Sequence, residues 1–416
     1  MWAVPRRKIF LCNGTCRNIF ELAIKRQIIG GGYIAKFENL FASYIGVKEA
    51  VSISSGTAAL SLILECLDLK AGDEAILPAY TFPSVPACIG EFGLVLRFVD
   101  IDLNTDNIDI LKLEEAINHK TKLIVATHIF GRPCDIETIV AMAKERGIYV
   151  IEDCAHAIGS EYKGKKLGSF GDAAYFSFSI TKPFNTFNGG MIAANNPELI
   201  RKIRGKVEKI PDLPSCILYK NILFSYSLCF LTSPVIFTFF IYPALLLLSL
   251  INMDLIRLYN KTFKKSVFMG TKKFKFTNLQ ALVGIKMLDS HRQYFLERAN
   301  KIKLFNELCM ENHIDIGNER IMKHQIIFHY FFVIKHQNQY ALAKKMLWNG
   351  IDTGKHLMSN CGKLFSDSYC YPNAEQARRY SLQIPIEHCT QEVMGKIIRV
   401  LKECGGVPPL SLNSGI

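Results

Sequence analysis

The sequence contains no long block of lysine or arginine, although 50 basic residues against 37 acidic ones give a net charge of +13. Because the basic residues are dispersed, nucleic acid is the partner that the charge favours least, and we predict none; an anionic lipid surface or an anionic substrate fits better. The 13 cysteines include no CxxC motif and no Cys/His spacing typical of zinc. We therefore predict no metal site, and reduced cytosolic thiols instead of a disulfide framework.

The first ten residues, MWAVPRRKIF, are partly basic but lack a sustained apolar core. This pattern argues against a cleaved signal peptide, and we expect a cytoplasmic protein. A chain of 416 residues exceeds one average domain and fits a two-domain enzyme with a large core.

From about residue 36 to 195, short apolar runs alternate with helix-like stretches such as Ile136–Arg146. The alternation predicts an α/β domain with a mostly parallel sheet, whose ligands bind beyond the carboxyl ends of the strands. The predicted strands are Ala50–Ile53, Glu74–Leu77, Leu94–Val99, Leu123–Thr127, Ile148–Glu152, Ala173–Phe176 and Met191–Ala194.

Lys182 and Asp153 are the first pair of candidate catalytic residues. Lys182 lies in the segment 175–183, which reads YFSFSITKP, and Asp153 ends the apolar run 148–153, IYVIED. A pyridoxal phosphate (PLP) enzyme needs a lysine that binds the aldehyde as a Schiff base and a carboxylate that keeps the pyridine nitrogen protonated. Either residue alone is weak evidence, since most lysines are solvated and many strands end in aspartate.

The third element is a candidate phosphate site at residues 52–60, SISSGTAAL. A strand-like stretch runs into a glycine turn and then into a helix, whose first N–H groups bind anions. We expect a phosphate to dock on the backbone of Gly56, Thr57 and Ala58, with the Thr57 hydroxyl as a further donor. An ordinary strand–turn–helix junction is the alternative interpretation of this segment alone.

Residues 221–253 carry no charge and are long enough to cross a bilayer as a helix, but Pro234 and Pro243 interrupt them. Two short helices in a membrane-dipping hairpin fit the prolines better than one straight span, and a buried helix pair at a domain or dimer interface is the alternative. Basic residues on both sides fit an anionic surface. They are Lys202, Arg204, Lys206, Lys209 and Lys220 before the segment, and Arg257, Lys261, Lys264 and Lys265 after it.

The remaining chain predicts a connecting helical region and a smaller α+β domain. Its expected pieces are a helical pattern from Leu282 to Lys303, a strand at Ile326–Ile334, helices at Tyr340–Trp348 and Gln391–Glu403, and a loose tail. The predicted organisation is an N-terminal arm at 1–29, a large domain at 30–210, the hydrophobic insertion at 211–268, the connecting helix at 269–300, the small domain at 301–408 and the tail at 409–416.

Taken together, the motifs resemble the DegT/DnrJ/EryC1/StrS sugar aminotransferases, which are fold-type-I PLP enzymes. The resemblance runs from about Gly30 to Lys402, interrupted by the apolar segment. The matching stretches are GGYIAKFE at 31–38, SSGTAAL at 54–60, GDEAILPAYTF at 72–82, HIFG at 128–131, EDCAHAIG at 152–159, GSFGD at 168–172, SFSITK at 177–182 and GGMI at 189–192.

The resemblance implies a role for each matching residue. It assigns Lys182 to the imine with the cofactor, Asp153 to the pyridine nitrogen, His156 to the vicinity of the phenolic oxygen and Phe82 to stacking on the ring. Thr57, Ala58 and Ser177 match phosphate-binding positions. Lys273 and Lys275 stand where the family commonly has Asn-x-Arg, and a lysine meets a phosphate as a point charge without the fork of an arginine.

The resemblance also implies the reaction and the assembly. We expect an amino group to pass from an amino acid, such as glutamate, to a keto-sugar, most plausibly nucleotide-linked, in a homodimer whose sites use both subunits. Attachment to the inner face of the membrane would suit surface polysaccharide biosynthesis. Another PLP enzyme, such as a sugar dehydratase or a decarboxylase, and a membrane-associated relative without catalytic activity remain as alternatives.

Overall fold

The computed structural model describes residues 2–7, 9–12, 14–250, 272–314, 325–326, 332–354, 358–365, 370–386 and 389–405. Three sequence expectations fall wholly or partly outside these ranges. They are the centre of the strand expected at 326–334, the end of the apolar segment with the basic residues Arg257, Lys261, Lys264 and Lys265 that follow it, and the tail.

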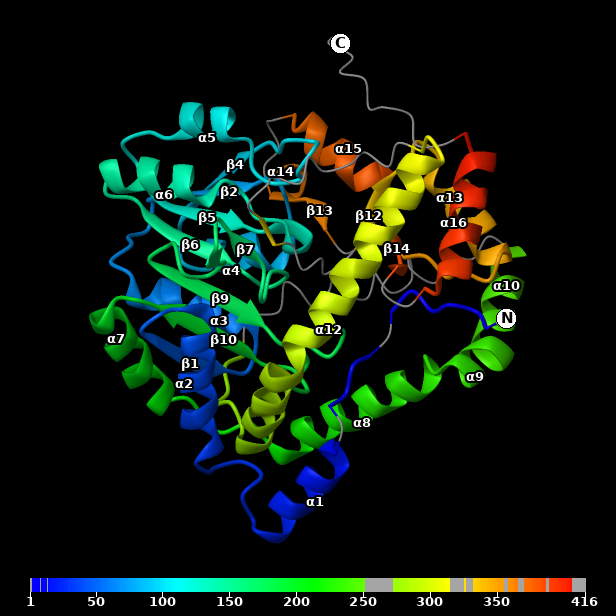
Figure 1. Ribbon diagram of the computed structural model, residues 1–416. Helices are drawn as coiled ribbons and strands as arrows, with labels where there is room; N and C mark the ends of the chain where they lie inside the picture. Colours follow the sequence, from blue (N-terminus) through cyan, green and yellow to red (C-terminus); the bar gives the residue numbers. More distant parts are fainter. Residues whose placement is uncertain are drawn as a thin grey trace.

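A seven-stranded sheet in the order β1-β10-β9-β6-β5-β2-β4 is the centre of the large domain (Figure 1). All seven predicted strands are present, and β10 is the one strand of this sheet that runs in the direction opposite to the other six. The mostly parallel α/β fold expected from the sequence is therefore confirmed. The strands are β1 (Glu49–Ile53), β2 (Glu74–Pro78), β4 (Val95–Val99), β5 (Thr121–Thr127), β6 (Tyr149–Asp153), β9 (Ala173–Ser177) and β10 (Gly190–Ala194).

Both faces of the sheet are buried under helices. Because successive side chains along each strand point to opposite faces, neighbouring residues enter different cores. Ile124 and Val150 pack in one core with α2 (Tyr33–Ile45) and the start of α12, whereas Val125 and Ile151 pack in another with α3. The helices of this domain are α1 (Thr15–Ile24), α2, α3 (Gly56–Cys66), α4 (Ser84–Gly90), α5 (Ile110–Ala116), the short 3₁₀ turn η1 (Ile129–Gly131), α6 (Ile136–Glu145) and α7 (Pro197–Glu208), with the short strands β7 (Glu161–Tyr162) and β8 (Lys165–Lys166).

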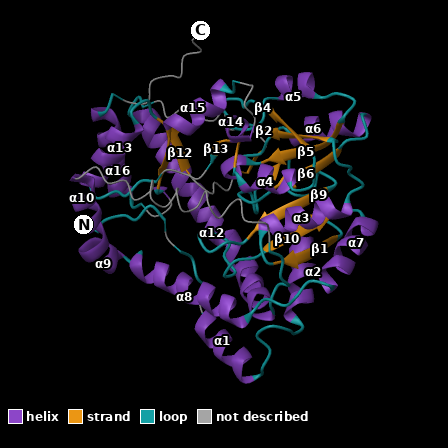
Figure 2. Cartoon of the chain, turned by 180° about the vertical axis from the view of Figure 1, so that it is seen from behind, coloured by secondary structure: helices purple, strands orange, loops and turns teal. Residues whose placement is uncertain are grey.

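The long helix α12 (Asn278–Glu311) connects the sheet domain to the small C-terminal domain, and Figure 2 shows it between the two. A third core, which includes Phe305, Ile334 and Leu401, holds the small domain together. Two strand pairs join the domains, β13 with β3 (Tyr80–Thr81) and β11 with β7. The C-terminal elements are β11 (Gln325–Ile326), β12 (Phe332–Lys335), α13 (Gln339–Trp348), β13 (Ser359–Asn360), α14 (Cys361–Phe365), α15 (Pro372–Tyr380), β14 (Ser381–Ile384) and α16 (Gln391–Glu403).

The described part of the apolar insertion is a bent helical rod that runs from α1 to the N-terminus (Figure 1). It contains α8 (Ser215–Leu231), α9 (Pro234–Ile236), the π-helical turn η2 (Phe237–Ile241) and α10 (Tyr242–Leu250). The rod bends by 62° at the break before Pro234. Pro243 interrupts nothing, because helical structure continues through it after the wider π turn.

Within the described ranges, no individual helix combines the length and apolar composition needed to cross a bilayer; the two arms of the bent rod meet that criterion only together. The rod also packs on the protein itself. Leu218 is fully buried in the large-domain core, the Ala3 N–H donates to Thr238 Oγ1 at 2.9 Å, and the Tyr242 hydroxyl donates to the Leu347 carbonyl at 2.8 Å. The insertion thus contacts the large domain, the N-terminal arm and the small domain.

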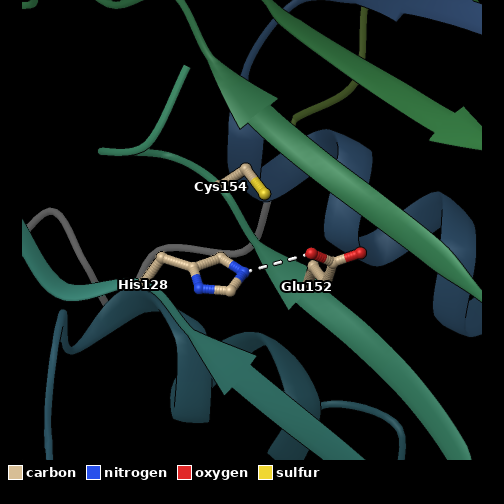
Figure 3. A group of neighbouring side chains, drawn as sticks. All are labelled: His128, Glu152 and Cys154. Carbon is tan, nitrogen blue, oxygen red and sulfur yellow. Dashed lines mark hydrogen bonds and ion pairs between the residues drawn. The ribbon is translucent and has the colours of Figure 1, made fainter. Parts of the chain in front are cut away.

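A buried carboxylate, Glu152, ties the sheet to the loop that precedes β9, and Figure 3 shows its contact with His128. Glu152 is fully buried, and its Oε1 accepts the N–H groups of Phe170 and Gly171, each at 2.8 Å. Its Oε2 accepts the Gly168 N–H at 2.8 Å and lies 3.1 Å from His128 Nε2. Four donors therefore hold this carboxylate directly beneath the strand ends, next to Asp153.

His128, Glu152 and Cys154 lie close enough together to suggest a metal site, but each side chain has another role. The Cys134 N–H is directed at His128 Nδ1 at 3.3 Å, so the other ring nitrogen carries the hydrogen that Glu152 accepts. Burial raises the pKa of the Cys154 thiol to about 12, so this thiol stays protonated beside the His128–Glu152 pair. The cluster is a hydrogen-bonded anchor for the strand ends.

Replacing the anchor, Glu152→Ala, leaves one side chain and three backbone N–H groups without their buried acceptor. We expect a loss of about 3–5 kcal/mol in the free energy of unfolding, measured by urea denaturation. The matched control is Glu161→Gln, which removes a partly exposed ion pair to Lys166 and should cost less than about 1 kcal/mol. Equal losses in the two variants would contradict the anchoring role.

Candidate active site

A cavity of about 490 Å³ opens at the carboxyl ends of the parallel strands, where ligands of such sheets bind. Four strands bring residues to it. Ser55 and Gly56 follow β1, His128 follows β5, and Asp153 and Ser177 end β6 and β9. Lys182 reaches the cavity from the loop after β9. The structure therefore brings together the lysine, the carboxylate and the helix start that the sequence predicted separately.

The start of α3 forms the anion-binding end of the cavity. Gly56 and Thr57 are its first residues, so their N–H groups have no partner within the helix. The next N–H, that of Ala58, donates to Ser55 Oγ at 3.1 Å, and Ala58 is absent from the cavity wall. A Cβ atom on Gly56 would lie 2.8 Å from Ser177 Cβ, so the close packing of helix against strand requires glycine here.

Lys182 and Asp153 line the same cavity, with Asp153 almost fully buried and Lys182 partly buried. Asp153 is 5% exposed, and its Oδ1 accepts the Ala155 N–H at 3.0 Å. The Lys182 amine donates to the Ala155 carbonyl at 2.6 Å, so both groups contact the same short segment after β6. This shared contact holds the amine beside the carboxylate.

Burial tunes both groups. It lowers the pKa of Lys182 to about 7, against the opposing charge of Asp153, because a desolvated ammonium is unfavourable. Burial also raises the pKa of Asp153, opposed by the neighbouring Tyr175 hydroxyl, the Ala155 N–H and the charge of Lys182. With a pKa near 7, Lys182 has a substantial neutral fraction at that pH, and the neutral amine has the lone pair that imine formation requires.

Other predicted site residues divide between the cavity and its surroundings. Phe82, His156 and Ser177 line the cavity, and the imidazole of His156 stacks on Phe130 with the ring centroids 6.1 Å apart. Lys273 is absent from the cavity wall and forms an ion pair with Glu65 instead. The predicted contact of Lys273 with the phosphate is therefore absent within a single chain.

Lys275 is the second lysine of that predicted pair. Its Nζ lies 3.9 Å from Asp212 Oδ1, and it is likewise absent from the cavity wall. Any phosphate contact from Lys273 or Lys275 would have to be made in a partner's site.

Sequence reasoning missed several residues of the cavity wall. Arg7 comes from the N-terminal arm, and Asn221 and Phe224 come from α8 in the hydrophobic insertion. No local motif marks these three, because tertiary packing brings them to the site. His128 and Tyr175 also line the cavity, and their strand-end positions were a usable signal.

The insertion contributes to the cavity wall through a fixed contact. Asn221 Nδ2 donates to the Phe187 carbonyl at 3.2 Å, and the Phe187 ring lies near Tyr226, with centroids 6.4 Å apart. Phe187 is buried in the loop between Lys182 and β10. The α8 helix is thus held against the loop that carries the candidate catalytic lysine.

The residues present fit PLP. The start of α3 provides donors for a phosphate, Asp153 provides a buried acceptor for a ring N–H, and Lys182 provides a desolvated amine. The close approach of Gly56 to Ser177 shapes the surface on which the phosphate would rest. Phe82 supplies an aromatic ring in the same cavity. This donor set matches what the cofactor requires at each of its ends.

Comparison with known proteins adds an independent line of evidence. The model of the DegT/DnrJ/EryC1/StrS aminotransferase family matches residues 15–402. The GDP-perosamine synthase of Escherichia coli O157:H7 is 45% identical over 169 residues, which are 41% of this chain and 46% of that protein. A dTDP-3-amino-3,6-dideoxy-alpha-D-galactopyranose transaminase of Aneurinibacillus thermoaerophilus is 42% identical over 174 residues, 42% of this chain and 48% of that protein. Each match spans about half the length of the relative.

Solved structures resemble this one over nearly the whole chain. An aminotransferase from Psychrobacter cryohalolentis has a TM-score of 0.75 at 21% identity, covering 96% of this chain and 98% of that one. A Helicobacter pylori aminotransferase involved in the biosynthesis of pseudoaminic acid has a TM-score of 0.74 at 20% identity, covering 97% and 99%. These likenesses support the fold, and the match over residues 15–402 shows that the chain belongs to the DegT/DnrJ/EryC1/StrS aminotransferase family.

Proposed function

We propose that this protein is a PLP-dependent aminotransferase that moves an amino group from an amino acid, such as glutamate, to a nucleotide-linked keto-sugar. The observation that carries the proposal is the buried Lys182 amine, held beside Asp153 in a cavity that ends at the start of α3. The names of the relatives support the substrate class, because they act on GDP- and dTDP-linked sugars. The product would enter amino-sugar and surface polysaccharide biosynthesis.

When bound, PLP would supply an electron sink that makes a proton on the donor's α-carbon removable. The protein's own part is to place bases and exclude water. Lys182, with its lowered pKa, accepts and returns that proton as general base and acid. Asp153 would supply a negative charge to the pyridine nitrogen, and the N–H groups of Gly56 and Thr57 would hold the phosphate.

Lysine at position 182 favours amino transfer over dehydration. Amino transfer needs an amine that forms an imine with the cofactor aldehyde, and Lys182 supplies that amine in the cavity. Two further candidates are a PLP-dependent decarboxylase and a membrane-associated protein without catalytic activity. The buried Lys182 and Asp153 pair opposes the inactive candidate, because a pair without a role would cost desolvation energy for no gain.

The working assembly that we propose is a homodimer. Lys273 and Lys275 support it by position, since both lie outside the cavity of their own chain although they align with a phosphate-binding motif. In a dimer, this segment would face the partner's site. Its point-like ammonium groups would neutralise a phosphate there without a bidentate fork.

We further propose that the insertion attaches the enzyme to an anionic membrane surface at the cytoplasmic side. Several large apolar side chains on the bent rod are more than half exposed, among them Leu223, Phe230, Phe239, Phe240 and Leu247. Exposed apolar side chains on a helical rod suit contact with a membrane interface. Exposed lysines just before and within the start of α8, Lys209 and Lys220, add attraction to anionic lipid headgroups.

The lowered pKa of Lys182 predicts how fast the apoprotein captures added PLP at different pH. Only the neutral amine attacks the aldehyde, so the capture rate should rise with pH, with a midpoint at about 7, and level off at higher pH. With a solvated lysine, the capture rate would keep rising up to about pH 10.4. Because Asp153 raises the pKa of Lys182, Asp153→Asn should shift the midpoint lower. Cofactor absorbance in stopped flow measures the capture rate of the native protein and of the variant. A native midpoint near the value of a solvated lysine would contradict the burial argument.

Substitution of the two central residues tests the activity itself. With labelled glutamate and a panel of nucleotide keto-sugars, the native enzyme should yield a labelled amino-sugar, and Lys182→Ala should yield none. Asp153→Asn should slow turnover by about a hundredfold, because the charge facing the ring nitrogen is lost. The control Lys165→Ala removes an exposed lysine and should keep full activity. Turnover by Lys182→Ala would refute the mechanism.

Vesicle binding tests the membrane surface. The combined variant Leu223→Ser, Phe230→Ser, Phe239→Ser and Phe240→Ser should lose sedimentation with phosphatidylglycerol vesicles, which the native protein should bind better than phosphatidylcholine vesicles. The control Leu111→Ser changes an equally exposed residue on α5, outside the rod, and should bind as the native protein does. Native protein that binds neither vesicle, or a variant that changes only the oligomeric state, would contradict membrane attachment.

A further inference from the structure

We infer that Arg7 is the residue that binds the anionic group of an incoming reactant in this active site. The inference rests on the proposed function and adds to it a recognition element that lies outside every family motif in the chain. Arg7 lines the same cavity as Thr57 and Lys182, and its Nε atom is buried. A partly buried guanidinium in a cavity wall forms strong charge-assisted hydrogen bonds with an anion, because it can donate two parallel N–H groups.

The backbone around Arg7 is fixed on the small domain. Val4 forms a parallel bridge with Ile351, with hydrogen bonds of 2.8 Å from the Val4 N–H to the Gly350 carbonyl and 2.9 Å from the Asp352 N–H to the Val4 carbonyl. Arg6 then forms a bidentate pair with Asp352, at 2.8 Å and 2.7 Å. Arg7 therefore enters the cavity from an anchored segment, which lowers the entropy that binding would cost.

The charges of the cavity wall point to Arg7 as the group that would bind a second anion. Of the described residues in its wall, Arg7 alone carries a permanent positive charge. The charge of Lys182 is not permanent, because its pKa is about 7, and this amine would bind the cofactor; His128 points its Nε2 at Glu152. The cofactor phosphate has its own donors at Gly56 and Thr57. A second anion in the cavity would have Arg7 as its cationic partner.

Both reactants of the proposed reaction carry such an anion. An amino-acid donor brings a carboxylate, and a nucleotide-linked sugar brings a diphosphate. The planar guanidinium pairs with either through two parallel hydrogen bonds, which a lysine does not reproduce. The two reactants occupy the cavity in turn, so one residue can serve one of them or both.

Binding without turnover tests the inference independently of the reaction. Calorimetric titration of the PLP-loaded protein with succinate and with GDP uses a dicarboxylate and a nucleoside diphosphate that do not react. Arg7→Gln should weaken binding of at least one probe by about tenfold or more, the effect of losing a charge-assisted hydrogen bond. Arg7→Lys should recover part of the loss. The control Arg17→Gln removes an exposed arginine of α1 and should bind both probes normally.

Half-reaction kinetics then identify the reactant. If Arg7 binds the donor carboxylate, Arg7→Gln raises the glutamate concentration that gives the half-maximal rate; if it binds the diphosphate, the keto-sugar half-reaction shows this change instead. Equal affinity of Arg7→Gln and the native protein for both probes, or a loss confined to PLP affinity, would overturn the inference. A native protein that binds GDP through Arg7 but transfers no amino group would instead refute the proposed function alone.

Discussion

The desolvation of one amine sets the requirements for the rest of the site. Lys182 loses water when it is buried, and its pKa falls to about 7 although Asp153 lies close by. To hold an amine and a carboxylate together in this way, the chain needs a rigid frame, because uncompensated buried charge is costly. The parallel sheet supplies that frame, and Glu152 fixes the strand end that carries Asp153 through four hydrogen bonds.

Much of the large domain could be predicted from the sequence because its signals are local. Each of the seven strands is a short apolar run, and helical segments separate several of them. The alternation of Ile124 and Val125 between two cores is a direct result of strand geometry. The same logic placed Asp153, Gly56 and Lys182 at strand ends. Parallel strands end at one edge of the sheet, so residues far apart in the sequence meet there.

The rest of the site depends on contacts that no local pattern records. Arg7 reaches the cavity because Val4 and Arg6 bind the small domain, more than 300 positions away in the chain. Asn221 lies in a segment whose composition indicated only membrane or interface burial. Pro243 looked like a helix breaker, yet the π turn at Phe237–Ile241 precedes it and the helix continues. The periodicity of a sequence does not reveal such a turn.

The α8 helix belongs to two surfaces at once. Phe224 and Asn221 face the cavity, while Leu223 and Phe230 are exposed on the outside of the same 17-residue helix. Mutations of the exposed residues that move α8 would also move Asn221 and Phe224 in the cavity wall, since a helix moves as a unit. A substitution that tilts α8 to suit its outer contacts would therefore also reshape the cavity wall that Asn221 and Phe224 form.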